Sequence, residues 1–188
     1  MMTAEVKLSP EEEKRKEAWL ESLGNFVVKA NSVTWAGEGK EVPSQRPGYK
    51  ELEYEEGDWL LRDSYAGYYR APGMTTVYYK GLNNPAWTVQ YGGHGQTEEF
   101  YGHAKETFKF LKAALRGMIP ELPIRGPQEY VEGNKKYTFE VIEGDDITDL
   151  SWQERITEDG ILTFTQKGTV GIVISRDSNR QPVYPWNL

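Results

Sequence analysis

Asp63 is the residue whose type and position most clearly suggest chemistry. It stands in a strand-like run, residues 59–65, in which alternation places Asp63 on one face with Trp59, Leu61 and Tyr65. A carboxylate on an apolar face is costly, and it either pairs with a cation or takes a raised pKa. The position therefore predicts a carboxylate that binds a ligand or transfers a proton inside an aromatic pocket.

Other interpretations of Asp63 stay open. Arg46 and Arg70 are candidate structural partners for the carboxylate, and a solvent-exposed face would remove the cost of burial. If the protein is an enzyme, we expect a hydrolase in which Asp63 works with Asp58 or Glu56, since paired carboxylates serve as acid and base in hydrolysis. Carboxylates are common, so this pattern alone does not decide for an enzyme.

Aromatic residues gather around the same run. Residues 47–95 contain ten Tyr or Trp side chains, whereas the matching stretch 123–171 contains five aromatic side chains. Phenol and indole rings combine apolar area with a polar tip, which suits a wet concavity. We predict a ligand pocket lined by Trp59, Tyr65, Tyr79, Trp87 and Tyr91. In this prediction Asp63 holds a cationic or hydrogen-bonding group of the ligand, and Arg46 gates the site from a long loop.

Cysteine, histidine and glycine-rich motifs do not indicate a further site. The chain has no cysteine, which excludes disulfides, thiolate zinc sites and cysteine nucleophiles. His94 and His103 are too few for a histidine-rich metal site, so we expect no metal. The run Gly92–Gly95 lacks the spacing and the lysine of a phosphate loop, and it predicts a close-packed turn that ends the sheet. No nucleotide motif indicates a cofactor, and no nucleophile motif is present.

Net charge limits the partners. The chain carries −7 at pH 7, which argues against direct binding to nucleic acid or to anionic membranes, because both require a basic surface. No apolar run approaches the length that spans a bilayer. We therefore expect a cytoplasmic protein whose partner is a small cationic or neutral molecule.

Helix and strand patterns alternate along the chain. A capping box and a clean apolar stripe predict a helix over residues 10–31. Strand-like runs follow, then a second helix that begins after Thr97, then further strands. We expect a disordered leader at residues 1–8, a single fused domain over 9–174 and an irregular tail at 175–188.

The chain contains one short motif twice. It reads Glu-Tyr-Glu-Glu-Gly at 53–57 and Glu-Tyr-Val-Glu-Gly at 129–133, a spacing of 76 residues. The fold class is α+β, and the spacing predicts internal duplication of a helix plus antiparallel-sheet unit, with a pseudo-twofold and the helices packed on the sheet. The alternative is a chance match between similar segments. The repeats would span about 9–96 and 97–174. In this frame the counterpart of Asp63 is Phe139.

The middle of the chain also contains a set of short motifs. They are Thr34-Trp35-Ala36-Gly37, Arg46-Pro47-Gly48, Leu52-Glu53-Tyr54, Gly57-Asp58-Trp59, Arg62-Asp63-Ser64-Tyr65, Val77-Tyr78-Tyr79, Pro85-Ala86-Trp87 and Tyr91-Gly92. Over roughly residues 26–172 this set resembles an uncharacterised bacterial family, domain of unknown function 5680. Such domains occur alone or behind a helix-turn-helix in regulators, so the resemblance implies sensing of a small molecule. The family provides no catalytic residues to carry over, and a Glu expected shortly before the Val-Tyr-Tyr strand is missing here.

These observations leave three classes of function. The leading prediction is a small-molecule-binding, sensor-like module with its aromatic pocket in the first repeat. The second is a protein-interaction or structural domain, which an exposed aromatic patch without a cavity would favour. The third and least favoured is a hydrolase-type enzyme that uses carboxylates.

Overall fold

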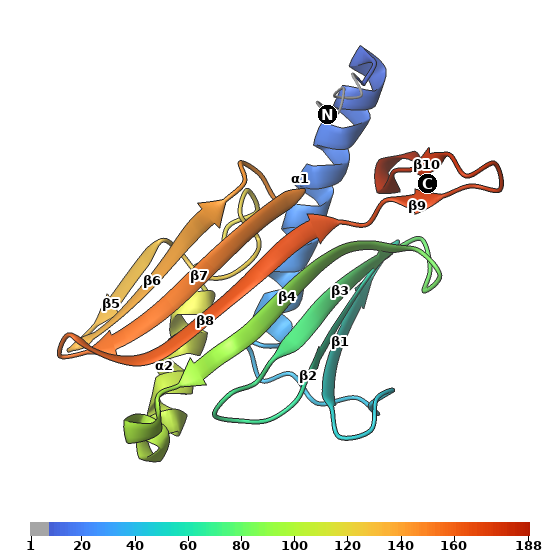
Figure 1. Cartoon of the computed structure of the whole chain (residues 1–188). Helices are drawn as coiled ribbons and strands as arrows, with labels where there is room; N and C mark the ends of the chain where they lie inside the picture. The colour runs from blue at the N-terminus through green and yellow to red at the C-terminus, as the bar shows by residue number, and fades with distance from the viewer. Residues whose placement is uncertain (1–7) are drawn as a thin grey trace.

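The computed structural model describes residues 8–188, and it shows one curved antiparallel sheet with two α-helices on the same face (Figure 1). This is the α+β architecture that the alternating patterns predict. The predicted leader lies outside the described residues except for Leu8, which packs against the hydrophobic core. Within residues 8–188, no helix has both the length and the apolar character needed to cross a bilayer.

Helix α1 (Pro10–Val33) follows the predicted bounds closely. Its capping box is formed: the backbone N–H of Glu12 donates to Ser9 Oγ at 3.3 Å, and the Ser9 N–H donates to Glu12 Oε2 at 2.9 Å. Gly24 does not break the helix. A Cβ at this position would lie 2.1 Å from the carbonyl oxygen of Pro120, so glycine lets another part of the chain pass close to α1.

Eight strands pair antiparallel in the main sheet. Their order is β1-β2-β3-β4-β8-β7-β6-β5, so β4 and β8 meet at the centre and β1 and β5 form the edges. In chain order the strands are β1 (Lys50–Glu56), β2 (Trp59–Tyr65), β3 (Gly73–Tyr79), β4 (Pro85–Gln96), β5 (Glu129–Glu132), β6 (Lys135–Glu143), β7 (Asp149–Glu158) and β8 (Ile161–Ile172).

The glycine run in β4 forms a bulge and does not end the sheet. Gly92–Gly95 lies inside β4, and the pairing of β4 with β8 shifts register between these glycines. A Cβ at Gly95 would lie 2.3 Å from the carbonyl oxygen of Tyr69, because the loop after β2 crosses the strand here. The prediction of close packing is confirmed, and the prediction that the sheet ends at this run is wrong.

The second helical segment begins as a 3-10 turn. This turn, η1 (Glu98–His103), leads into α2 (Ala104–Leu115). Thr97 forms no side-chain cap, and its Oγ1 donates instead to the carbonyl oxygen of Thr163 in β8 at 3.2 Å. One face of α2 is buried and largely apolar.

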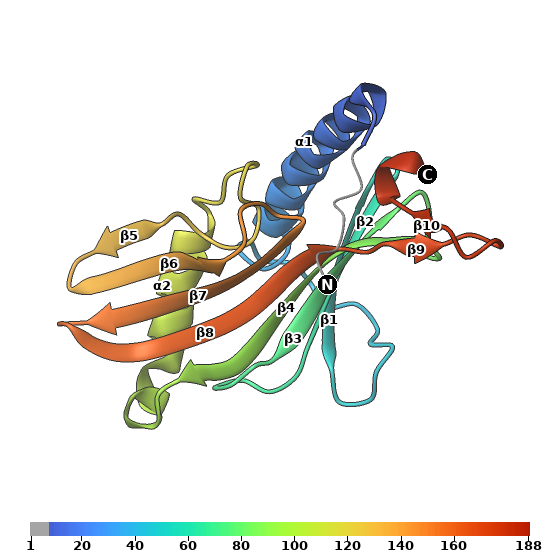
Figure 2. The ribbon, with the colours of Figure 1, turned by 45° about the horizontal axis from the view of Figure 1, so that its top comes forward.

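The C-terminal tail, predicted to be irregular, forms a small hairpin and a 3-10 turn. Strands β9 (Ser175–Arg176) and β10 (Pro182–Val183) pair with each other, and η2 (Pro185–Asn187) follows. Trp186 is buried against Trp19 of α1, with ring centroids 6.2 Å apart. The tail therefore packs beside the N-terminal half of α1 (Figure 2).

The hydrophobic core lies between the helices and the sheet. Helix α1 packs on β1 and β2, and α2 packs on β6, so each helix covers strands that follow it in the chain. Alternation along β2 turns Trp59, Leu61 and Asp63 toward this core, where all three side chains are buried. The same face therefore contains both the packing residues and the candidate site.

Candidate functional site

Asp63 is buried beneath the helices, on the face that alternation predicts. Its side chain is 4% exposed. Thr75, its cross-strand neighbour on β3, donates a hydroxyl hydrogen bond to Asp63 Oδ1 at 2.7 Å. The hydroxyl of Tyr91 on β4 lies 2.9 Å from Oδ1 and 3.1 Å from Oδ2. Among residues 8–188 no lysine or arginine pairs with this carboxylate, so the partners it has there are neutral hydroxyls.

Gly73 allows Tyr91 to reach the carboxylate. Gly73 faces Tyr91 across the β3–β4 pair and Tyr65 across the β2–β3 pair. A Cβ at Gly73 would lie 2.5 Å from the Tyr91 hydroxyl oxygen. The phenol therefore crosses β3 where the side chain is missing, and its hydroxyl extends to Asp63.

Arg125 brings the second half of the chain to the same place. It lies between α2 and β5, and it forms a bidentate pair with Glu154 of β7, with Nε 2.9 Å from Oε2 and Nη2 2.7 Å from Oε1. The hydroxyl of Tyr137 donates to Glu154 Oε2 at 3.0 Å. The guanidinium carbon lies 5.6 Å from the ring centroid of Trp35 and 6.0 Å from that of Tyr91. One buried cation thus contacts a carboxylate and several aromatic faces.

Burial controls the protonation of these groups. Removal from water raises the pKa of the Asp63 carboxyl, although hydrogen bonds from Thr75 and Tyr91 and the charge of Arg125 offset part of the rise. Burial, reinforced by the charge of Asp63, raises the pKa of Tyr91 well above its ordinary value, so this phenol stays neutral. Burial disfavours the charged form of Arg125, but attraction to Glu154 outweighs it and holds the pKa of the guanidinium above its ordinary value.

A small cavity lies beside these groups, and we call it the Asp63 cavity. Asp63 and Arg125 both line it, and its volume of about 40 Å³ accommodates water molecules or a small head group, not a whole metabolite. The other lining residues come from α1, the loop after it, the strands β2 to β4 and the segment after α2. They are Val27, Asn31, Thr34, Trp35, Leu61, Thr75, Trp87, Val89, Tyr91, Met118, Pro123 and Ile124.

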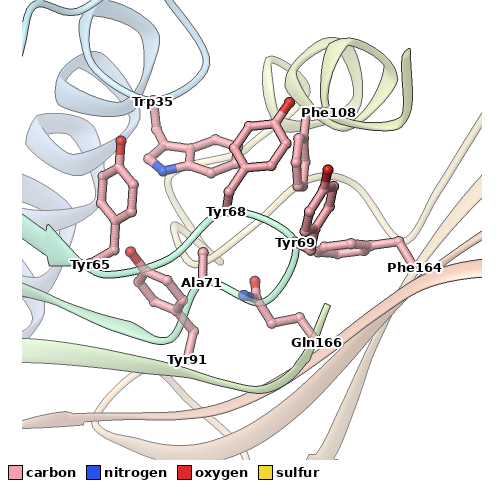
Figure 3. Close-up of a pocket in the computed structure, with 9 residues that line it drawn as sticks. All are labelled: Trp35, Tyr65, Tyr68, Tyr69, Ala71, Tyr91, Phe108, Phe164 and Gln166. Carbon is pink, nitrogen blue, oxygen red and sulfur yellow. The ribbon is translucent and has the colours of Figure 1, made fainter. Parts of the chain in front are cut away.

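An aromatic recess, shown in Figure 3, shares Trp35 and Tyr91 with the Asp63 cavity. Its walls come from the loop after α1, from β2 and the loop that follows, from α2, and from β4 and β8. The lining residues are Trp35, Tyr65, Tyr68, Tyr69, Ala71, Tyr91, Phe108, Phe164 and Gln166. The rings fill most of the space between them, because the remaining volume is about 20 Å³.

A wide groove, which we call the α2 groove, opens outside the recess. Its volume is about 1,230 Å³, and it runs between α2, the loop after α1, β1 and the β5–β6 hairpin. Trp35 lines the groove, the recess and the Asp63 cavity, so its indole separates open space from the buried cluster. Side chains of α2 hold the loop of Trp35: Lys112 donates to the Gly37 carbonyl oxygen at 3.2 Å, and Arg116 donates to that of Ala36 at 3.1 Å.

Several residues predicted to line the pocket do meet here. Asp63, Trp87 and Tyr91 line the Asp63 cavity, and Tyr65 lines the recess and the α2 groove. The indole N–H of Trp87 donates to the carbonyl oxygen of Ile147 at 2.8 Å, so this ring offers the cavity an apolar surface. The first-half aromatics thus surround the carboxylate on one side only, and the second half supplies the other side.

The other predicted lining residues, Trp59, Tyr79 and Arg46, line neither the Asp63 cavity nor the recess nor the α2 groove. Trp59 and Tyr79 pack together, with ring centroids 4.4 Å apart, and both contact Trp19 of α1. They hold α1 on the sheet, because this end of β2 and β3 lies directly under the helix. Arg46 is exposed in the loop before β1, with its guanidinium carbon 5.5 Å from the ring centroid of Tyr49, and it does not line the Asp63 cavity.

The carboxylates expected to act with Asp63 are also distant from it along the strand. Glu56 and Asp58 are exposed at the β1–β2 turn, and Glu56 Oε2 lies 2.5 Å from Lys29 Nζ. Glu154 is also a buried carboxylate, but it is paired with Arg125. The arrangement does not provide the predicted acid–base pair.

The sequence patterns do not predict Arg125 or Glu154 as site residues. Glu154 was open to the argument that identified Asp63, since it alternates with Trp152 and Ile156 on a strand and therefore faces the core. Arg125 has no such pattern, because it lies in an irregular segment whose path depends on tertiary packing. Only the apolar and proline-rich surroundings of this arginine hinted at burial.

Comparisons with known proteins bear on the central part of the chain. A family model described as Domain of unknown function (DUF5680) matches residues 63–173. This span contains Asp63, Tyr91, Arg125 and Glu154, and it does not include α1 or the loop that carries Trp35. No curated protein and no solved structure matches the chain.

Proposed function

We propose that this chain, which belongs to the family described as Domain of unknown function (DUF5680), is a small-molecule-binding module of the sensor type. The Asp63 cavity would take the head group of the ligand. That head group is a small organic cation, such as a primary ammonium, that donates hydrogen bonds to the carboxylate. A cytoplasmic location, with no cofactor and no direct contact with nucleic acid, belongs to the same proposal.

The observation that carries the proposal is an imbalance of buried charge around the cavity. Asp63 and Glu154 are both buried carboxylates, and Arg125 is the buried cation beside them. The fork of Arg125 is occupied by Glu154, which leaves Asp63 with hydroxyl partners. An isolated buried carboxylate is expensive, and it is stabilised by a proton or by a cation that enters the adjoining space.

The walls of the cavity suit an ammonium group. Trp35, Trp87 and Tyr91 line it, and aromatic faces attract a cation through the ring quadrupole. The hydroxyls on Asp63 leave further lone pairs of the carboxylate open for a donor. The volume of about 40 Å³ fits a head group of one or two heavy atoms, so the rest of a larger ligand would extend past Trp35 toward the α2 groove.

A thermal-shift series with simple amines tests this proposal. Methylammonium, ethylammonium and phenethylammonium chlorides would be compared with methanol, ethanol and phenethyl alcohol, which match them in shape without the charge. We expect the ammonium series to raise the melting temperature of the wild type, because a ligand that binds only the folded state stabilises it. Asp63→Asn and Asp63→Phe should abolish that rise while each variant still melts cooperatively.

Asp58→Asn is the matched control, since it removes one carboxylate from the exposed end of the β1–β2 hairpin. It should respond to the amines as the wild type does. An equal response of Asp63→Asn and the wild type would refute the head-group site. Equal shifts from the alcohols would show that charge plays no part in it.

We also propose that the sheet arose by duplication of a unit made of a helix and four strands. In support, Tyr54 and Tyr130 occupy the same position in the β1–β2 and β5–β6 hairpins, and each donates to the Glu two residues on, at 2.5 and 2.9 Å. Each ring also packs on a helix, at 5.8 Å from Phe26 of α1 and at 5.4 Å from Phe110 of α2. A superposition of the halves that failed to bring these tyrosines together would contradict the duplication.

A further inference from the structure

The α2 groove contains a row of cations that the Asp63 cavity does not use. The row consists of Lys105, Lys109 and Lys112 of α2 and of Arg116, the residue directly after the helix, and all four line the groove. Their spacing places them along one face of the helix. Within residues 8–188 none of the four forms an ion pair with a carboxylate, although the whole chain carries −7. Positive charge is therefore concentrated in one concavity of an acidic protein.

This row is unfavourable for the helix itself. Like charges one turn apart repel each other. Lys105 adds a cation near the beginning of α2, where the helix dipole disfavours positive charge. Lys112 and Arg116 offset part of this cost by donating to carbonyl oxygens of the loop after α1. Lys105 and Lys109 are exposed, and an anion in the groove would relieve their repulsion.

Four glutamates, Glu38, Glu41, Glu106 and Glu132, also line the groove, but within residues 8–188 none of them forms an ion pair with this row. Glu41 lies 3.0 Å from Lys50 and is neutralised by it. Glu132 accepts a hydrogen bond from the hydroxyl of Tyr130 at the β5–β6 hairpin. Of the glutamates that line the groove, Glu106 is the one on α2 itself. The face of α2 that lines the groove is therefore mainly basic.

Aromatic side chains line the groove next to the cations. Trp35, Tyr65, Tyr68 and Phe108 all line it, and Tyr68 is 54% exposed. The rings of Tyr68 and Phe108 meet edge to face, with centroids 5.2 Å apart. Such rings offer an apolar surface on which a flat molecule can stack.

We infer that the α2 groove is a second binding site, and that its ligand is an organic anion with a planar apolar body. The carboxylate or phosphate group of the ligand lies at Lys105 and Lys109, and its body packs against Tyr68 and Phe108. The groove volume of about 1,230 Å³ accommodates a molecule of metabolite size. Trp35 lines both spaces, but Lys105 and Lys109 would hold the anion whereas Asp63 would hold the ammonium, so each proposal has its own test.

Calorimetric titration with naphthalene derivatives tests the inference. The anions are 2-naphthoate and 2-naphthyl phosphate, which separate the carboxylate from the phosphate chemistry, and the neutral and cationic counterparts are 2-naphthamide and 2-naphthylmethylammonium. We expect at least one anion to bind, and the neutral and cationic compounds to bind about tenfold more weakly or not at all. Binding of the anion should weaken as salt is raised, because exposed charges are screened.

The double variant Lys105→Gln/Lys109→Gln should weaken anion binding about tenfold, since two exposed charge contacts are lost. Lys14→Gln/Lys167→Gln removes the same charge from exposed positions on α1 and β8 and should bind as the wild type does. An equal loss in both double variants would reduce the effect to net charge and overturn the site. Equal affinity for 2-naphthamide and for the anions would also overturn the site. Binding of poly-glutamate without binding of either naphthalene anion would overturn it too, and would indicate a macromolecular partner.

Discussion

Asp63 and Glu154 are both buried carboxylates, and they differ in their partners. Glu154 accepts two hydrogen bonds from the guanidinium of Arg125 and a third from the hydroxyl of Tyr137. Asp63 accepts hydrogen bonds from the hydroxyls of Thr75 and Tyr91. A charge-assisted pair compensates the loss of hydration far better than neutral donors do. Asp63 is therefore the group whose charge state depends on what enters the cavity.

The raised pKa of Asp63 predicts a pH dependence of stability. Between the ordinary value of 3.8 and the higher pKa of the folded state, the folded protein keeps a proton that the unfolded chain has released. The contribution of Asp63 to the free energy of unfolding is therefore greatest at low pH and falls as pH rises through this window. We expect Asp63→Asn to remove this fall, so that its stability relative to wild type improves with rising pH. Urea unfolding at a series of pH values measures the difference, and parallel profiles would contradict it.

Strand alternation predicted that Asp63 is buried, because the face of a residue in a strand follows from its neighbours in sequence alone. The partners of Asp63 could not be predicted in the same way. Thr75 and Tyr91 become neighbours only through the pairing of β2, β3 and β4. Arg125 reaches the cluster from a segment without regular structure. Trp59 and Tyr79 were assigned to the pocket because the alternation does not show where along a strand a helix crosses.

At the scale of elements, α1 is stabilised by two surfaces, the sheet and the C-terminal tail. The part over the sheet is held by Phe26, which stacks on Trp59 with centroids 5.7 Å apart. Nearer the beginning of α1, Trp19 contacts both Trp59 of the sheet and Trp186 of the tail. Trp186 in turn stacks on Tyr184, with centroids 4.8 Å apart. The tail thus adds to the sheet as a surface against which this end of the helix buries its apolar face.

Trp186→Ala should therefore destabilise the whole protein and not the tail alone. We expect a loss of about 3 kcal/mol in the free energy of unfolding, because the substitution leaves a large void against Trp19. Leu188→Ala is the control, since Leu188 is 41% exposed and its truncation should change stability by less than about 0.5 kcal/mol. Chemical denaturation followed by circular dichroism measures both variants. A Trp186→Ala protein as stable as the control would show that the tail contributes nothing to the fold.

Regular elements were predictable where the pattern is local. The capping box at Ser9 and the apolar stripe of α1 depend on residues within a few turns, and the structure confirms both. The bulge at Gly92–Gly95 was misread, since a glycine run is also the signature of a strand end. Its role depends on the loop after β2, which crosses the strand at Gly95.

At the scale of the whole molecule, the polar cluster joins the halves of the sheet. Asp63 and Tyr91 come from the β1–β4 half, whereas Arg125, Glu154 and Tyr137 belong to the half that contains β5–β8. The strands of the two halves meet along the β4–β8 pair. Arg125 therefore packs against residues of both halves, and its loss should affect the contact between them.

Arg125→Met should be among the most destabilising single substitutions in the chain. It leaves Glu154 buried without its cation, and removal of one partner of a buried pair costs about 3–5 kcal/mol. Adding Glu154→Gln to the same variant removes the uncompensated charge and should recover part of the loss. Arg155→Met, at an exposed position on β7, is the control and should stay within about 0.5 kcal/mol of wild type. Urea unfolding decides: a cost below about 1 kcal/mol for Arg125→Met would contradict this role of the pair.

The strand order has a consequence for how the polypeptide is made. During translation β4 leaves the ribosome with its outer edge unpaired, and that edge stays open until β8, the last long strand, has been synthesised. Contacts between segments so far apart in sequence form slowly, and open edges invite pairing between nascent chains. The bulge at Gly92–Gly95 interrupts the regular hydrogen-bond ladder along this edge of β4. The edge is therefore a poorer template for a strand of another chain during the time before β8 pairs with it.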